Sequence, residues 1–227
     1  MEPAIWYPEQ REEELGGKIS RRKEEWRKVE MKRKTWRVVK EGMWLRWKEG
    51  KVEGEGRNRK MSKEEEEVVE KEIRSMMRQG VIEEREESQE GFISPISIGE
   101  REGEKRMVVD FRKLNEKLKE EEFRQEVFKD ARKLLREEDW IVKIDFKRAY
   151  HAVQVRKEDR KYLRIRWKGR IFEFKGMPLG LSTSPYYFNL IMKEMAKHLR
   201  KREIRVVYYV DDWLILGRSK VEAEEKA

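Results

Sequence analysis

The stretch Val206–Leu216 reads VVYYVDDWLIL and places two adjacent carboxylates, Asp211 and Asp212, between two apolar runs. Short runs rich in β-branched and aromatic residues predict strands, so the pair belongs at or beside the tip of a hairpin. Aspartate is a common turn residue, which makes a simple strand connection one interpretation. Carboxylates among apolar neighbours otherwise need a compensating charge, and a bound cation is the obvious source. Both alternatives stay open on this stretch alone.

Composition narrows the class of protein. The chain has 227 residues, of which 45% are charged, against about a quarter in ordinary domains. The net charge of +9 suits a polyanionic partner, but a purine-rich coding strand would favour the same residue types and explains the charge equally well. The absence of cysteine excludes disulfides and thiolate metal sites, and the two histidines argue against His-rich zinc chemistry.

Targeting signals are not evident in the sequence. No apolar run approaches the length of a membrane span, and Met1–Trp6 lacks a basic region followed by an apolar core. We therefore expect an intracellular protein of the cytoplasm or nucleus, without a membrane partner.

The first 60 residues are charged and carry several tryptophans. Their spacing predicts short helices with one apolar face. Packing of the tryptophans on the main domain is the favoured interpretation, and a grip on nucleic acid is the alternative. Gly54–Gly56 predicts an exposed linker. The tryptophans concerned are Trp26, Trp36, Trp44 and Trp47.

The middle of the chain predicts a helix followed by a strand. Ser62 and Glu65 form a capping box at the start of the helix, and Gly80 ends it. Phe92–Ile98 then predicts a strand, in which Pro95 favours a position at a sheet edge.

Two further strands flank a helix. Arg106–Phe111 predicts a strand that returns beside the previous one, and a helix is expected around Phe128–Arg136. Trp140–Phe146 predicts the next strand. Its alternation places Lys143 and Asp145 on the face opposite the more apolar side.

The last third of the chain predicts a hairpin and a long helix. Tyr162–Trp167 and Arg170–Phe174 flank a turn and read as paired strands. We expect Ser184 to cap the following helix, with Pro185 as its first residue and Arg200 near its end.

Three carboxylates therefore lie at strand ends: Asp145, Asp211 and Asp212. Phosphoryl transfer assisted by two divalent cations requires such a supply of hard oxygen ligands. One aspartate on a strand is usually a solvated residue, whereas three on neighbouring strands favour the metal site over the simple turn.

Several motifs resemble those of reverse transcriptases. Tyr209–Asp212 resembles the Tyr-x-Asp-Asp signature, and Ile144–Tyr150 resembles the motif of the first catalytic aspartate. Met177–Pro185 resembles the Pro-x-Gly loop with its following helix. Arg106–Asn115 resembles the fingers motif, preceded by a strand at Ser94–Pro95. All occur in the order of the family.

The resemblance implies an α/β (α+β) fold of polymerase fingers and palm, with an antiparallel palm sheet backed by helices. Residues 1–60 would be a charged, Trp-bearing extension, 61–139 mainly fingers and 140–227 mainly palm. The family continues with more palm, a thumb and a ribonuclease H domain. The resemblance therefore predicts a fragment, or a truncated or decayed copy that grips template-primer poorly.

The resemblance also implies a metal site. Asp145, Asp211 and Asp212 would be catalytic and would bind two Mg²⁺ ions, with Mn²⁺ as the alternative. The carbonyl group of Phe146 would assist.

Five other residues would contact substrates. Arg106 would bind the triphosphate of the incoming dNTP, with a plain surface arginine as the alternative. Tyr150 would lie under the sugar and exclude a 2′-hydroxyl, unless it is only a core aromatic. Leu179 and Gly180 would line the nucleotide pocket, although Gly180 equally suits a turn. Tyr209 would support the primer end.

One position departs from the family pattern. The fingers lysine that often contacts the triphosphate has no clear equivalent, because an ungapped match falls near Gly99. Arg101 or Lys105 would be its substitute.

A finer resemblance is to the DIRS-type retrotransposons, which pair this polymerase with a tyrosine recombinase. It rests on Leu15–Ser20, the Trp26 and Trp36 segment with Gly42, Gly80–Glu83, Gly180–Pro185 and Asp211–Ile215. The implied function is template-directed DNA synthesis from dNTPs on an RNA or DNA template with primer. Alternatives are a non-catalytic nucleic-acid-binding relic, an RNA-dependent RNA polymerase and a structural basic domain. Tyr150 and Tyr209 argue against the RNA polymerase, and the ordered motifs argue against the structural domain. The sequence does not determine the oligomeric state.

Overall fold

The computed structural model describes residues 14–86, 90–101, 103–126 and 132–227. Of the helix expected around Phe128–Arg136, residues 128–131 lie outside these residues, and the expectation was wrong for residues 133–136, which are not helical. Within them, no helix has the length and apolar character needed to cross a membrane. In chain order the elements are α1 (Lys18–Arg21), α2 (Lys23–Trp26), α3 (Arg33–Glu41), β1 (Gly54–Glu55), α4 (Lys63–Arg78), β2 (Ile82–Arg85), β3 (Phe92–Ser94), β4 (Ile96–Arg101), β5 (Glu104–Val109), α5 (Arg112–Lys117), β6 (Trp140–Asp145), η1 (Ala149–Ala152), α7 (Lys157–Arg160), β7 (Arg164–Trp167), β8 (Arg170–Phe174), α8 (Ser184–Arg200), β9 (Arg205–Tyr209), β10 (Asp212–Gly217) and α9 (Lys220–Glu225).

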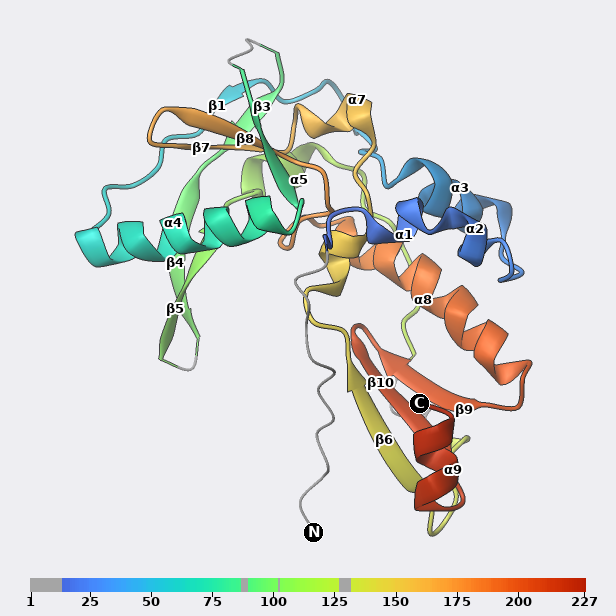
Figure 1. The fold of residues 1–227 in the computed structure, drawn as a ribbon. Helices are drawn as coiled ribbons and strands as arrows, with labels where there is room; N and C mark the ends of the chain where they lie inside the picture. The colour runs from blue at the N-terminus through green and yellow to red at the C-terminus, as the bar shows by residue number, and fades with distance from the viewer. Residues whose placement is uncertain (1–13, 87–89, 102, 127–131) are drawn as a thin grey trace.

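The described strands form three sheets. A five-stranded sheet has the order β1-β3-β7-β8-β2, a three-stranded sheet the order β6-β10-β9, and β4 pairs with β5 alone. Figure 1 shows the three-stranded sheet at one end of the molecule, with α8 leading from the five-stranded sheet toward it. This mixed arrangement confirms the expected α/β class.

The three-stranded sheet is antiparallel throughout and packs one face on the core. On that face Trp213 is 1% exposed and stacks on Tyr208, with ring centroids 5.2 Å apart. The hydroxyl of Tyr208 donates to Oδ1 of Asn189 on α8, at 3.3 Å. A buried tyrosine hydroxyl needs such a partner, so this bond ties the sheet to the helix behind it. Leu134 and Leu135 pack on the opposite face.

Local signals for helix and turn chemistry are confirmed in two places. Ser62 accepts the N–H of Glu65 and the Glu65 carboxylate accepts the N–H of Ser62, which completes the capping box at the start of α4. The turn between β7 and β8 holds Lys168 and Gly169 at φ of 47° and 80°. Two consecutive positive φ values match the right-handed twist of a two-residue hairpin.

Two expectations about the strands were wrong. Phe92–Ile98 is not one strand, because Pro95 divides it into β3 and β4, which belong to different sheets. Proline has no N–H for a ladder, so the chain changes sheet at that residue. Gly54–Gly56 is not only a linker, because β1 pairs in parallel with β3.

The expected cap of the long helix was also wrong. Thr183 occupies the N-cap position of α8 without a capping side chain, and Ser184 is the first helical residue. The hydroxyl of Ser184 instead donates to the carbonyl of Pro178 at 2.8 Å. The serine therefore holds the preceding loop against the helix.

The N-terminal tryptophans pack on the main domain, as expected. Trp44 lies edge-on to Tyr187 at 5.3 Å, and the Tyr187 hydroxyl donates to the Trp44 carbonyl at 2.7 Å. Trp47 lies edge-on to Tyr162 at 4.7 Å. The division at residues 60 and 139 stays a prediction, but the five-stranded sheet takes strands from all three segments.

Candidate active site

Strand pairing brings the three predicted carboxylates to one end of the three-stranded sheet. Asp145 is the last residue of β6 and lies directly opposite Asp212, the first residue of β10. The N–H of Phe146 donates to the carbonyl of Asp211 at 3.2 Å, which continues the pairing beyond the ladder. The strand register therefore brings aspartates that are far apart in the sequence to the same end of the sheet.

The turn that carries Asp211 contains an unusual backbone conformation. Val210 adopts a φ of 56°, in the left-handed region. A β-branched residue is a genuine outlier there, at a cost on the order of 1–3 kcal/mol. Backbone outliers of this kind concentrate at functional sites, so the turn is better explained as a site than as a plain connection.

Lys143 is a member of the site to which we assigned no role from the sequence. Its ammonium lies 2.8 Å from Oδ1 of Asp212, and both side chains are exposed, at 62% and 47%. The hydrogen bond to Asp212 raises the pKa of Lys143, and the negative charges of Asp145 and Asp211 act in the same direction. All three carboxylates thus act on one cation. The signal was present in the alternation of β6, which puts Lys143 on the face of Asp145.

These carboxylates fit a divalent cation by the chemistry of their oxygen atoms. Carboxylate and carbonyl oxygens are the ligands that Mg²⁺ prefers. Among the described residues, however, no three Asp, Glu, His or Cys side chains are gathered closely enough to hold a metal ion. Lys143 occupies one Asp212 oxygen. The carbonyl of Phe146 accepts the N–H of Ala149 at 3.2 Å, so one of its two lone pairs remains available.

Tyr150 lies on η1, beside the carboxylates. Its ring stacks on Phe188 of α8 at 4.8 Å with an interplanar angle of 19°. Partial burial raises the pKa of Tyr150, and the negative charge of Asp211 adds to this effect. The ring of Tyr150 therefore packs on the core, while its hydroxyl is subject to the negative charge of Asp211.

The next residue, His151, connects η1 to the loop before α8. It is buried, and its Nδ1 lies 3.0 Å from the carbonyl of Met177. Burial lowers the pKa of His151 to about 4, and the charge of Arg148 contributes. The imidazole is therefore neutral at ordinary pH and binds that carbonyl through Nδ1–H.

Gly180 lies in this loop at a φ of 86°. A Cβ atom there would lie 3.6 Å from the Phe111 ring, an ordinary contact, so the backbone conformation rather than crowding requires glycine. Asn115 donates to the Gly180 carbonyl at 3.0 Å and accepts the N–H of Ser182 at 2.9 Å. Asn115 was quoted above in the fingers motif without a role; the structure shows that it ties that motif to the loop.

The remaining predicted residues lie on the surface. Leu179 and Tyr209 are 57% and 59% exposed. Arg106 lies on β5, bonded to Glu104 at 2.8 Å, and Figure 1 shows its hairpin apart from the three-stranded sheet. Tyr209 thus lies beside the carboxylates, directly opposite Asp212 in the β9–β10 register, whereas Arg106 is not brought to them (Figure 1).

Arg101 and Lys105, the expected substitutes for the missing fingers lysine, lie on the same β4–β5 hairpin as Arg106. Gly99 is opposite Arg106 in the β4–β5 register. Lys105 pairs with Glu64 of α4 at 2.8 Å. A triphosphate would therefore compete with Glu64 for the Lys105 ammonium.

Comparisons with known proteins agree with the resemblance. Residues 98–227 match the family model described as reverse transcriptase (RNA-dependent DNA polymerase). The Tf2-3 and Tf2-7 transposon polyproteins of Schizosaccharomyces pombe are 32% and 31% identical over 155 residues, which is 66% of this chain and 11% of each polyprotein. The chain thus spans about a tenth of the length of these curated relatives.

A solved structure supports the fold. The native prototype foamy virus protease–reverse transcriptase superposes with a TM-score of 0.62 over 80% of this chain and 24% of that chain, at 19% identity. Because the family model covers more than half of the sequence, the chain belongs to the reverse transcriptase (RNA-dependent DNA polymerase) family.

Proposed function

We propose that this chain is the fingers and part of the palm of a retrotransposon reverse transcriptase, with Asp145, Asp211 and Asp212 as catalytic residues. Its reaction would be template-directed DNA synthesis from dNTPs on an RNA or DNA template with primer. The observation that carries the proposal is the register of β6 and β10, which sets Asp145 directly opposite Asp212, the residue that follows Asp211.

The carboxylates and the Phe146 carbonyl would hold two Mg²⁺ ions, or Mn²⁺. Bound there, the metal supplies the charge neutralisation that phosphoryl transfer to a primer 3′-hydroxyl requires. The attraction of Lys143 to Asp212 supports this assignment, because it shows that the negative charge at this end of the sheet already draws in a cation.

The substrate roles follow from side-chain chemistry and position. Arg106 would bind the triphosphate through its guanidinium fork. Tyr150 would exclude a 2′-hydroxyl, and its stacking on Phe188 supports this role because the ring has no free space behind it. Leu179 and Gly180 would line the nucleotide pocket, and Tyr209 would support the primer end.

The finer assignment to the DIRS-type group is also a proposal. It rests on the sequence segments described above, of which Gly80–Glu83 and Gly180–Pro185 are examples. A coding sequence for a tyrosine recombinase beside this reading frame would support the assignment. An integrase of another type in that place would contradict it.

Primer extension tests the proposed activity. The wild-type chain should extend a primer on an RNA template only when Mg²⁺ or Mn²⁺ is present. Asp211→Asn keeps the shape of the side chain but removes its charge. It should reduce the rate at least about a hundredfold, since metal-assisted charge stabilisation contributes several kcal/mol. Glu137→Gln, at an exposed carboxylate in the loop before β6, is the matched control and should extend normally.

The relic alternative predicts a different result. A wild-type chain that binds template-primer but never extends it under any metal condition would favour a non-catalytic nucleic-acid-binding relic. Extension that Asp211→Asn leaves unchanged would remove the catalytic assignment.

A further inference from the structure

The end of the three-stranded sheet opposite the carboxylates contains a basic hollow of about 530 Å³. It lies beside the start of β9, the end of β10 and the loop that precedes β6. Strand length places it about 17 Å from the aspartates, at roughly 3.3 Å per residue. The lining residues are Leu134, Arg136, Arg200, Glu203, Ile204, Arg205, Arg218, Glu222 and Lys226.

Three of the cations in this hollow have carboxylate partners. Arg200 makes a two-bond contact with Glu126, at 2.7 and 2.8 Å. Lys226 pairs with Glu222 at 2.6 Å. Their charges are therefore largely compensated within the chain.

The third partnered cation, Arg205, is held most firmly. It donates to both oxygens of Asp139 at 2.6 Å and to the Leu134 carbonyl at 3.2 Å. Asp139 is only 4% exposed and also accepts the N–H of Arg136 at 2.8 Å. This network fixes the Arg205 guanidinium at the wall of the hollow before any ligand arrives.

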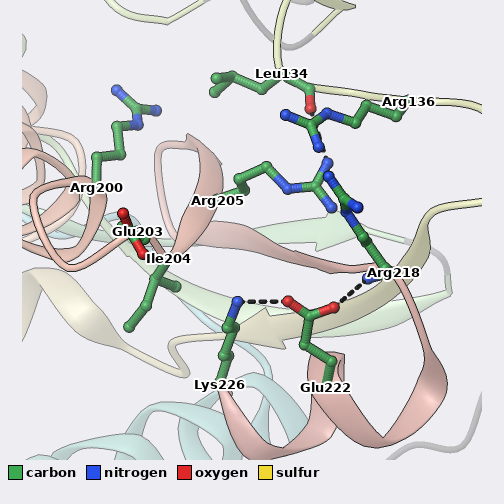
Figure 2. A pocket seen from close by; sticks show the side chains of 9 residues that line it. All are labelled: Leu134, Arg136, Arg200, Glu203, Ile204, Arg205, Arg218, Glu222 and Lys226. Carbon is green, nitrogen blue, oxygen red and sulfur yellow. Dashed lines mark hydrogen bonds and ion pairs between the residues drawn. The ribbon is translucent and has the colours of Figure 1, made fainter.

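Two cations remain without a side-chain partner. In the part of the chain that the structure describes, the guanidinium groups of Arg136 and Arg218 make no ion pair and no hydrogen bond; only the backbone N–H groups of these residues are bonded, to the carboxylates of Asp139 and Glu222. Figure 2 nevertheless shows their guanidinium groups directed toward that of Arg205, from three separate segments. Like charges repel, so guanidinium groups that converge in this way favour an anion between them.

We propose that Arg136, Arg205 and Arg218 form a phosphate site that takes the backbone of a nucleic-acid strand, at the end of the palm sheet remote from the catalytic carboxylates. Guanidinium groups bind phosphate oxygens through paired, charge-assisted hydrogen bonds. The hollow of about 530 Å³ has room for more than a single small ion, so it can take a strand.

A second hollow, lined by α4 and Lys168, provides a comparison, because it also contains several cations but has more carboxylates among its lining residues. It is also lined by several cations, Lys63, Lys71 and Lys168 among them, but Glu66, Glu67 and Glu70 are interleaved with them. Lys168 pairs with Glu70 at 2.8 Å. This second hollow is therefore the natural control.

The test measures binding of a fluorescent 20-nucleotide single strand by anisotropy, over a range of salt concentrations. The double variant Arg136→Gln, Arg218→Gln removes both unpaired cations and leaves the Arg205–Asp139 pair intact. Each phosphate contact contributes about 0.7 to the salt slope for single strands. The variant should lower that slope by about 1.4 and weaken binding roughly ten- to hundredfold at 50 mM salt. Lys63→Gln, Lys71→Gln removes the same charge from the second hollow and should have a much smaller effect.

Three results would overturn the proposal. Equal weakening by both double variants would mean that only net charge matters. Unchanged strand affinity in the Arg136 and Arg218 variant, combined with loss of thermal stabilisation by pyrophosphate, would mean that the hollow takes a free phosphate compound. Competition by polyglutamate as strong as by an unlabelled strand of equal charge would mean that phosphate is not recognised. Because no step needs catalysis, failure of the proposed activity leaves this result interpretable.

Discussion

The two ends of the three-stranded sheet are opposites in charge. At one end the ammonium of Lys143 bonds to Asp212, and the negative charges of Asp145 and Asp211 act on it as well. At the other end several arginines line a hollow, and one of them, Arg205, is bonded to the nearly buried Asp139. The first arrangement leaves negative charge uncompensated, whereas the second pairs three cations with carboxylates and leaves the guanidinium groups of Arg136 and Arg218 over. The comparison teaches that the same strands carry opposite charge at their two ends, as the two proposals, metal chemistry at one end and anion binding at the other, require.

The largest expected effect is a fall in the free energy of unfolding with pH, which should occur in different pH ranges for the two ends of the three-stranded sheet. His151 supports the loop beside the carboxylates and has a folded pKa of about 4, against about 6.5 when unfolded. Between these values the unfolded chain binds a proton that the folded chain does not. The free energy of unfolding should therefore fall by roughly 2–3 kcal/mol from pH 7 to pH 4.5.

Chemical unfolding of His151→Asn tests this prediction. The asparagine amide can still donate to the Met177 carbonyl but cannot take up a proton, so most of the pH dependence in this range should disappear. His198→Asn is the control at the other histidine and should retain the pH dependence. The Asp139–Arg205 pair lowers the pKa of Asp139 below 3.8, so the basic end should lose its stabilisation only at still lower pH. An unchanged slope in His151→Asn would contradict this assignment.

The next largest effect is expected at the basic end of the three-stranded sheet, where Arg205 pairs with Asp139. Arg205→Met leaves the nearly buried Asp139 carboxylate without its two-bond partner and should lower the free energy of unfolding by roughly 2–3 kcal/mol. Arg74→Met removes an exposed helix pair with Glu70 and should cost less than about 0.5 kcal/mol. Urea unfolding at pH 7 compares the two. Equal, small losses would mean that the Asp139 pair does not organise the basic end.

A smaller effect is expected for substrate choice at the acidic end. Tyr150→Val removes the ring that is stacked on Phe188, so incorporation of ribonucleotides relative to deoxynucleotides should rise about tenfold or more. Tyr150→Phe keeps the ring and should keep the discrimination. Single-nucleotide extension with each nucleotide type measures the ratio, and no rise in Tyr150→Val would leave Tyr150 as a core aromatic only.

The smallest effect should come from the ammonium at the acidic end. Lys143→Met removes a cation that competes for Asp212, so Mn²⁺ should bind about two- to fivefold more tightly, as expected for an exposed ion pair. Electron paramagnetic resonance of free Mn²⁺ measures this without any reaction. Lys220→Met, which removes an exposed partner of Glu224 on α9, is the control. If Lys143→Met acts through Asp212, it should have no effect in an Asp212→Asn background. Weaker Mn²⁺ binding in Lys143→Met would refute competition between Lys143 and the metal for Asp212.

Much of the local structure could be predicted because its causes lie within a few residues. The Ser62–Glu65 capping box and the Lys168–Gly169 turn depend on side-chain chemistry and φ preferences that neighbours determine. The Ser184 prediction was wrong for the complementary reason. Its hydroxyl found a better-placed acceptor, the Pro178 carbonyl, in a loop whose path depends on tertiary packing.

The sequence by itself determined the family, the three carboxylates and the strands that carry them, because motifs and alternation are properties of short stretches. Tertiary structure alone decided that Asp145 faces Asp212, that Lys143 bonds to Asp212, and that Asn115 holds the Gly180 loop. It also assembled the basic hollow from Arg136, Arg205 and Arg218, which are up to 82 positions apart in the printed sequence. Register and chain path bring such residues together, and both depend on burying the apolar face of the whole sheet rather than on any local pattern.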